Sequence, residues 1–153
     1  MPDVVELPEP APTPADPEAP EPVVELGSIA IPAIGIERTL FEGIRIPTYD
    51  LGPGHWPGTA MPGRIGNMVI GGHRTSRNAD FYALDQLRPG DEMLVTDAKG
   101  RTFRYVVERS EITDPLAALR IVNQTPDKTA TLFACHPPGE ITQRIVVHLA
   151  LMP

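Results

Sequence analysis

The sequence predicts a mainly β protein, folded as a compact barrel or sandwich with short helices. Short runs of β-branched and other apolar residues recur along the chain, Gly and Pro residues separate these runs, and only brief stretches carry a helical pattern. The 153 residues are enough for one domain around one core. Many short strands joined by tight turns favour an antiparallel-rich sheet that closes on itself or packs on a second sheet.

The first 26 residues differ in composition from the rest of the chain. They hold eight of the 19 prolines, seven acidic residues and no Lys or Arg, so they carry the whole formal charge of −7. Such a segment buries too little apolar surface to offset its ordering entropy. We therefore expect residues 1–26 to be a disordered, acidic, proline-rich linker, and residues 27–153 to form the folded domain.

Charge excludes some classes of partner. The domain has 13 acidic and 13 basic residues, so it lacks the basic excess that nucleic-acid binding requires. The acidic linker would be repelled by phosphates and anionic lipid heads. No stretch approaches the ~20 apolar residues of a membrane helix, and no signal-peptide pattern begins the sequence. We expect a soluble chain with no nucleic-acid partner.

Strands are expected wherever an apolar or alternating run lies between turn signals. The Lys99-Gly100 turn, with apolar runs on both sides, is the clearest hairpin. A buried run before His73 is consistent with a strand that ends at this histidine. The expected strands cover residues 27–31, 36–41, 67–72, 92–96, 102–109, 129–134 and 145–151.

Helices are expected to be few and short. Residues 52–63 are rich in Gly and Pro and indicate a loop or a short helical turn. Residues 81–87 place apolar side chains at helical spacing, with Asp80 as an N-cap. Residues 115–122 are expected to form one or two helical turns.

The single cysteine, Cys135, is the first candidate for chemistry. It follows the strand at 129–134 and precedes a turn-forming run, and scaffolds often hold reactive groups at a strand end beside a loop. One cysteine excludes an internal disulfide. Its position alone does not separate a nucleophile from a buried structural thiol, which is common for free cysteines.

A nucleophilic thiol needs a cationic neighbour, because a usual pKa of about 8.5 leaves little thiolate at neutral pH. His73 is the best imidazole by context, since the two glycines before it allow close approach of the backbone. His136 is expected to face away from Cys135, because successive strand residues alternate. His55 lies in the Gly/Pro-rich loop and His148 inside the last strand. Local patterns do not join any of them to the cysteine.

Arg144 begins the final strand, nine residues after Cys135. A turn between two antiparallel strands would bring both residues to the same end. A guanidinium there would stabilise negative charge on a carbonyl oxygen, although a solvated surface arginine is an alternative. A zinc site built from His73, Cys135, His136 and His148 is another, but its spacing matches no known ligand motif.

Taken together, these segments resemble the sortase family, and most closely the class E sortases of actinobacteria. The resemblance spans residues 27–153. Ala134 departs from the threonine usual before the cysteine, and Trp56 stands where tyrosine is common. The matching motifs are GHWPGTAMPG at 54–63, GNMVIGGHRT at 66–75, LRPGD at 87–91, TLFACHP at 131–137 and RIVV at 144–147.

The resemblance implies an eight-stranded sortase-type β-barrel with short helices, and a cysteine transpeptidase that needs no cofactor or metal. Cys135 would attack the Thr–Gly bond of a Leu-Ala-x-Thr-Gly-like or Leu-Pro-x-Thr-Gly-like sorting signal and form a thioacyl intermediate. His73 would act as general acid and base. Arg144 would bind the substrate and stabilise the oxyanion. The motifs also suggest five substrate-binding residues, namely Arg74, Thr131, Leu132, Ala134 and His136.

The implied partners are the sorting-signal peptides of secreted proteins and an amine of a cell-wall precursor, met at the extracellular face of a bacterial membrane. Membrane contact would run only through an anchor that is missing from this sequence, with residues 1–26 as the spacer to a sortase catalytic domain at 27–153. Two alternatives stay open. One is a sortase-like peptide-binding module with weak or no turnover, which Ala134 would explain. The other is a thiol hydrolase that releases the acyl group to water.

Overall fold

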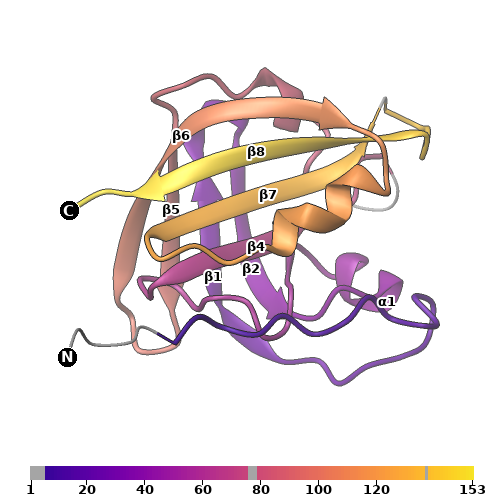
Figure 1. Cartoon of the computed structure of the whole chain (residues 1–153), viewed down its shortest axis with the longest axis horizontal. Coiled ribbons are helices and arrows are strands. Elements are labelled where there is room, and N and C mark those ends of the chain that lie inside the picture. The colour runs from indigo at the N-terminus through magenta and orange to yellow at the C-terminus, as the bar shows by residue number, and fades with distance from the viewer. Residues whose placement is uncertain (1–5, 76–78, 137) are drawn as a thin grey trace.

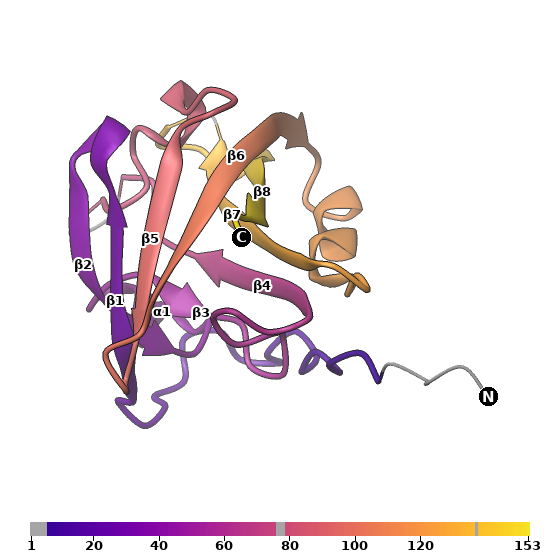
Figure 2. The same cartoon turned by 90° about the vertical axis from the view of Figure 1, so that its left-hand side faces the viewer.

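The computed structural model of the chain describes residues 6–75, 79–136 and 138–153. Within these residues, eight strands close into a barrel in the order β1-β2-β3-β4-β7-β8-β6-β5, which Figures 1 and 2 show from two sides. The expectation of a mainly β, eight-stranded barrel is confirmed. The strands are β1 (Glu25–Ile31), β2 (Ile36–Glu42), β3 (Gly54–His55), β4 (Gly66–Gly71), β5 (Glu92–Asp97), β6 (Thr102–Thr113), β7 (Lys128–His136) and β8 (Gln143–Leu151).

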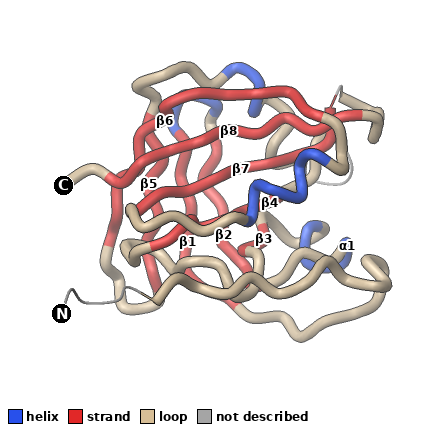
Figure 3. Tube along the Cα trace, in the orientation of Figure 1, coloured by secondary structure: helices blue, strands red, loops and turns tan. Residues whose placement is uncertain are grey.

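The helices are short and lie outside the barrel wall (Figure 3). None of those described is long and apolar enough to cross a membrane. Those at 32–34 and 46–49 were not expected from the sequence, and the second of them lies in the connection between β2 and β3. The helical elements are α1 (Ile46–Tyr49) and the 3-10 helices η1 (Pro32–Ile34), η2 (Leu84–Gln86) and η3 (Ala117–Val122).

The helix expected over 81–87 is wrong in length and in its cap. Only η2 forms there; its N-cap is Ala83, which makes no side-chain cap hydrogen bond. Asp80 instead pairs with Arg38 on β2, with 2.6 Å between Asp80 Oδ1 and Arg38 Nη1. The buried carboxylate therefore meets a guanidinium from another element, a long-range contact that local helix signals do not report.

Most strand pairs are antiparallel, as expected, but two are parallel. The hairpin of β5 and β6 is confirmed, with Glu92 opposite Val106 and Thr96 opposite Thr102. β2 pairs in parallel with the short β3, and β4 pairs in parallel with β7. Parallel neighbours need a long crossover, which β5, β6 and η3 provide between β4 and β7. Because β4 and β7 run in parallel, their C-terminal ends lie at the same end of the barrel.

Apolar residues pack on both sides of the wall formed by β4, β7 and β8. The larger cluster fills the barrel and includes Ala130, Leu132 and Ala134 of β7. A smaller cluster lies outside the wall, beneath η3. We call it the outer cluster; it consists of Ile44, Trp56, Val69, Ile121 and Val146, with Tyr49, Val122 and Phe133 packed against it.

The N-terminal segment, residues 6–24, contains no helix or strand and lies against the barrel and α1 (Figure 1). Ala11 N donates to Pro57 O over 2.8 Å, and Ile46 N donates to Pro17 O over 2.8 Å. β1 begins at Glu25, two residues before the expected domain boundary. Disorder of residues 1–26 stays a prediction, and residues 1–5 of that range lie outside the described residues.

His148, on β8, makes stability depend on pH. Burial lowers the pKa of His148 below its usual 6.5, and the nearby Arg109 charge lowers it further. The unfolded chain then binds the extra proton more readily. The part of the free energy of unfolding that depends on His148 is therefore fully present above about pH 6.5. It is lost as the pH drops through the lower folded-state pKa.

We expect His148→Gln to reduce the loss of Tm that the protein shows between about pH 7.5 and about pH 5.5. Thermal unfolding followed by circular dichroism at both pH values measures this difference. An undiminished pH dependence in the variant would contradict the assignment.

Candidate active site

Cys135 and Arg144 lie on two neighbouring strands, and His73 follows the end of a third. β7 lies between β4 and β8. On one side, Cys135 is directly opposite Arg144 in the antiparallel register. On the other, the parallel register ends with Gly71 opposite Phe133. β4 ends there, and His73 follows Gly71 by two residues, as Cys135 follows Phe133 on β7. Sheet register therefore pairs Cys135 with Arg144, while the role of His73 as partner of the thiol stays a prediction.

The period of two along a strand decides which side these residues face. Ala134 is buried in the barrel core, so its neighbours Phe133 and Cys135 face outward. On β8, Val146 belongs to the outer cluster, and Arg144 lies two residues before it on the same face. The thiol and the guanidinium therefore project from the outer face of the wall.

A cleft of about 390 Å³ lies on this outer face, and Cys135, His73 and Arg144 all line it. The outer cluster supplies an apolar floor. The N-terminal segment contributes one border, and the β7–β8 loop contributes another. An apolar cleft with a few polar groups at one place is typical of a binding site. Its apolar lining includes Pro14, Pro17, Ile44, Tyr49, Trp56, Leu119, Ile121, Phe133 and Ile141.

Gly71 allows two aromatic rings to approach the strand that carries His73. A Cβ at this position would lie 2.5 Å from Phe133 Cζ and 2.5 Å from Tyr49 Oη. At Gly72 a Cβ would lie 2.7 Å from a ring carbon of Phe81. The close approach expected at the two glycines is therefore made by side chains of the chain itself.

α1 and its C-cap hold the imidazole of His73. Nε2 of His73 lies 2.8 Å from Asp50 Oδ1, and the Tyr49 ring meets the imidazole edge-on at 5.8 Å between centroids. Only 11% of the His73 side chain is exposed. Because a carboxylate accepts, Nε2 carries the proton in this contact, and Asp50 fixes the orientation of the ring.

Tyr49 keeps its proton beside the site. Burial raises the pKa of Tyr49 well above its usual 10.0, and negative charge on Glu21 and Cys135 acts in the same direction, while Arg144 opposes them. The hydroxyl therefore stays neutral and available as a hydrogen-bond donor at physiological pH.

Arg144 is partly exposed and held by two backbone carbonyls, one in the β7–β8 loop and one at the first residue of β8. Its Nη1 donates to Ile141 O over 3.0 Å and to Gln143 O over 2.9 Å. These bonds keep the guanidinium at the start of β8, where it lines the cleft opposite Cys135. Its positive charge is therefore available to a group bound next to the thiol.

Two of the five suggested substrate contacts, Arg74 and His136, lie next to the site and engage each other. Arg74 Nη1 lies 2.9 Å from His136 Nδ1. Arg74 also lines the cleft, yet its side chain is almost completely buried. As expected, His136 is on the opposite face from Cys135, where it meets Arg74.

The other three suggested contacts are buried on β7. Thr131 and Leu132 are fully buried and do not line the cleft. The Thr131 hydroxyl donates to Asn67 Oδ1 over 2.8 Å. Ala134 lines the cleft while its side chain belongs to the barrel core. Their assignment as substrate contacts stays a prediction.

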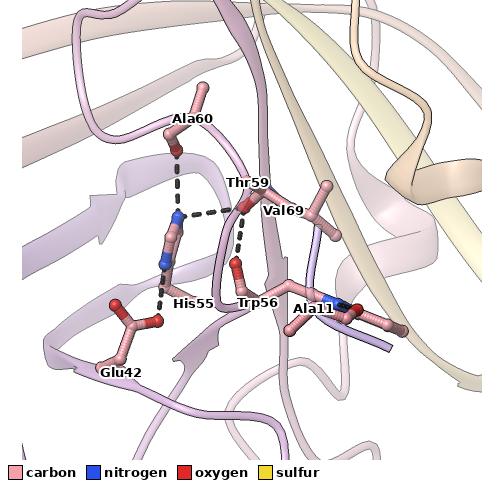
Figure 4. Close-up of polar contacts among 7 residues, drawn as sticks. All are labelled: Ala11, Glu42, His55, Trp56, Thr59, Ala60 and Val69. Atoms are coloured by element: carbon pink, nitrogen blue, oxygen red, sulfur yellow. Dashed lines mark hydrogen bonds and ion pairs between the residues drawn. The ribbon is translucent and has the colours of Figure 1, made fainter. Parts of the chain in front are cut away.

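A polar network fixes the loop that carries Trp56 (Figure 4). His55 is buried, with Nδ1 2.8 Å from Glu42 Oε1 and Nε2 3.0 Å from Ala60 O. The Trp56 indole donates to Ala11 O over 2.7 Å. The His55 side chain therefore connects the loop to Glu42 at the end of β2. Trp56 connects the outer cluster to the N-terminal segment.

The zinc alternative gains no geometric support. No group of three or more His, Cys, Asp and Glu residues that could hold a metal occurs in the described part of the chain. His148 lines a different cavity of about 330 Å³, and His136 is engaged by Arg74.

Sequence reasoning did not single out Tyr49 and Asp50, although both contact His73. The available signal was Pro47, which occupies the first turn of α1, where proline is favoured. That signal places a helix start but does not say which distant residue the helix meets.

A family model described as the sortase domain matches residues 29–152. The chain is 29% identical over 133 residues to sortase A of Streptococcus agalactiae serotype III (strain NEM316), covering 82% of this chain and 52% of the relative. It is 26% identical over 125 residues to sortase D of Bacillus subtilis (strain 168), covering 80% and 61%. The chain therefore spans only part of the length of these curated relatives.

Solved structures give the same match at the level of the fold. A Clostridium perfringens sortase D5 transpeptidase superposes with a TM-score of 0.75 at 31% identity, covering 84% of this chain and 79% of that chain. Sortase A from Corynebacterium diphtheriae superposes with a TM-score of 0.79 at 27% identity, covering 86% and 62%.

Gly71→Ala is expected to destabilise the protein by about 1–3 kcal/mol, because the added methyl group would overpack the contact with Phe133 and Tyr49. Denaturant unfolding measures the loss. The same substitution in a Phe133→Leu background should cost less, since leucine lacks the ring atom that meets the new methyl. Equal losses in both backgrounds would contradict the close contact.

Proposed function

This chain belongs to the sortase family, whose members are cysteine transpeptidases, and we propose that it cleaves C-terminal sorting signals and transfers the acyl group to an amine. One observation carries the proposal. Cys135 and Arg144 are opposite each other on β7 and β8, His73 follows the end of β4, and all three line a single cleft. A thiol, an imidazole and a guanidinium in one cleft are the groups that acyl transfer needs.

In the first half-reaction, Cys135 Sγ attacks, as thiolate, the carbonyl carbon of the threonine in the signal. The bond between this carbon and the glycine nitrogen breaks, which leaves a thioester on Cys135. His73 donates a proton to the departing glycine amine, because an unprotonated amide nitrogen leaves poorly.

In the second half-reaction, an amine attacks the thioester carbonyl. The amine gives a proton to His73, a new amide bond forms and the thiolate of Cys135 leaves. The protein thereby returns to its starting protonation state. An amine of a cell-wall precursor is the acceptor that we propose.

Arg144 acts on the oxygen of the carbonyl under attack. Negative charge develops there in both half-reactions, and a pre-oriented guanidinium stabilises it more than mobile water does. The bonds from Nη1 to Ile141 O and Gln143 O supply this orientation. The register that puts Arg144 opposite Cys135 supplies the proximity.

We propose Leu-Ala-x-Thr-Gly or Leu-Pro-x-Thr-Gly as the signal, and class E as the closest subgroup. The support is the resemblance of motifs 66–75 and 131–137, together with an apolar cleft that suits a leucine side chain. We further propose action at the outer face of a bacterial membrane, with the acidic residues 1–26 as a spacer.

A fluorogenic Leu-Ala-x-Thr-Gly peptide tests the function. We expect the wild-type protein to cleave it, Cys135→Ala to abolish cleavage, and an added amine to yield the ligated product. Product formed only with water would favour the hydrolase alternative. If no sorting peptide is cleaved and mass spectrometry detects no acylated Cys135, the proposed enzymatic activity is contradicted and a peptide-binding module is favoured.

His73→Ala and Arg144→Ala are each expected to lower kcat/KM by at least ~10²-fold, the usual scale for acid–base and oxyanion groups. His148→Gln and Arg88→Ala are matched controls, because both residues lie outside the cleft lining. Near-wild-type turnover in either test variant would remove that residue from the mechanism.

A further inference from the structure

The geometry points to Arg74 as a positioning residue that holds Cys135 and His73 in register. This inference rests on the proposed function, since it concerns how the thiol and the imidazole are presented to each other. Arg74 directly follows His73, and only 2% of it is exposed. A buried cation is costly unless its partners compensate for lost water, so those partners indicate its role.

The guanidinium of Arg74 joins two chain segments. Nη1 donates to Cys135 O over 2.9 Å and to His136 Nδ1 over 2.9 Å. Nε donates to Tyr82 O over 2.7 Å. Nη2 lies 3.1 Å from Asp85 Oδ1, which makes an ion pair without a directed hydrogen bond. Arg74 therefore connects the end of β7 to the segment that contains η2.

This connection lies where the sheet no longer fixes the two strands. Within the described residues, backbone bonding between β4 and β7 ends with Gly72 N donating to Phe133 O over 3.3 Å. His73 and Cys135 both lie beyond that bond. The bond from Arg74 Nη1 to Cys135 O is a second connection between the two segments, just after His73. His73 therefore lies between the Gly72–Phe133 backbone bond and the Arg74–Cys135 bond.

Arg74 also engages a second imidazole, that of His136, on the opposite face of β7 from the thiol. A guanidinium has no acceptor, so in this contact it donates and His136 Nδ1 accepts. While the bond exists, that nitrogen holds no proton. His136 Nδ1 is thereby occupied by Arg74, whereas His73 Nε2 carries a proton toward Asp50.

Lysine would not reproduce these contacts. The planar guanidinium presents Nη1 to two acceptors while Nε meets a third, whereas an ammonium is a single point on a flexible stem. We therefore expect Arg74→Lys to keep only part of the positioning effect and Arg74→Met to lose it.

A double-mutant cycle measures the coupling without a peptide substrate. Cys135 is the only cysteine, so iodoacetamide alkylation followed by mass spectrometry reports its reactivity alone. In the full chain, His73→Ala should slow alkylation at least roughly tenfold, because the imidazole supports the thiolate. In the Arg74→Met background the same change should have less than about a threefold effect.

Asp85→Asn is the matched control, since it removes the ion-pair partner of Arg74 and leaves the donors to Cys135 and His136 in place. It should preserve the full His73 effect. Circular dichroism and Tm of every variant exclude unfolding, and Arg74→Lys replaces Arg74→Met if the latter does not fold. With peptide, Arg74→Lys should lower kcat while KM stays within about threefold.

The inference would be overturned if His73→Ala slowed alkylation of Cys135 equally with and without Arg74. It would also be overturned if His73→Ala had no effect on alkylation in the otherwise unchanged protein. The same loss of coupling in Asp85→Asn would also overturn it, because the ion pair alone would then be responsible. If the peptide is cleaved but the effects of His73→Ala and Arg74→Met on alkylation are independent, only the role of Arg74 is contradicted. If the two effects are coupled but no peptide is cleaved, the role of Arg74 is supported and the proposed transpeptidase activity is contradicted.

Discussion

The register of β7 between β4 and β8 is the constraint on which the site depends. Successive strand residues face opposite sides, so a slip of one residue would turn Cys135 into the barrel and Ala134 toward the cleft. The apolar clusters on the two faces of β7 resist such a slip, because it would move interior residues to the outer face. Packing on both faces of one strand thereby fixes the neighbours of the thiol.

The orientation of His73 depends on a second chain of contacts that starts near the N-terminus. The first backbone N–H groups of a helix lack partners within it. At α1 the N-terminal segment supplies them, since Ile46 N donates to Pro17 O and the preceding Arg45 N donates to Glu21 Oε1. The other end of α1 presents Asp50 to the imidazole. A segment that looks like a simple spacer in sequence is therefore part of the support for His73.

The strands and the central residues were predictable because their signals are local or shared with a family. Apolar runs between Gly and Pro signals predicted every strand except the two-residue β3, which lies where a loop or a helical turn was expected. The motifs at 66–75, 131–137 and 144–147 gave the triad that we propose. The four residues of α1 are too few to show a helical period, so Asp50 was missed. The parallel pairing of β4 with β7 joins segments far apart in sequence, and no local pattern reports it. Asp80 was misassigned for the same reason, since its partner Arg38 is 42 residues away.

Two arginines near Cys135 differ in what their surroundings allow. Arg144 is partly exposed and bonded to two backbone carbonyls, so its charge remains able to meet a new negative charge in the cleft. Arg74 is buried, paired with Asp85 and bonded to three further groups, so a bound substrate would have to displace existing partners to use it. Such displacement would leave buried polar groups unpaired, which is costly. Physical chemistry therefore favours Arg144 for the oxyanion and Arg74 for holding the strand end that carries the thiol.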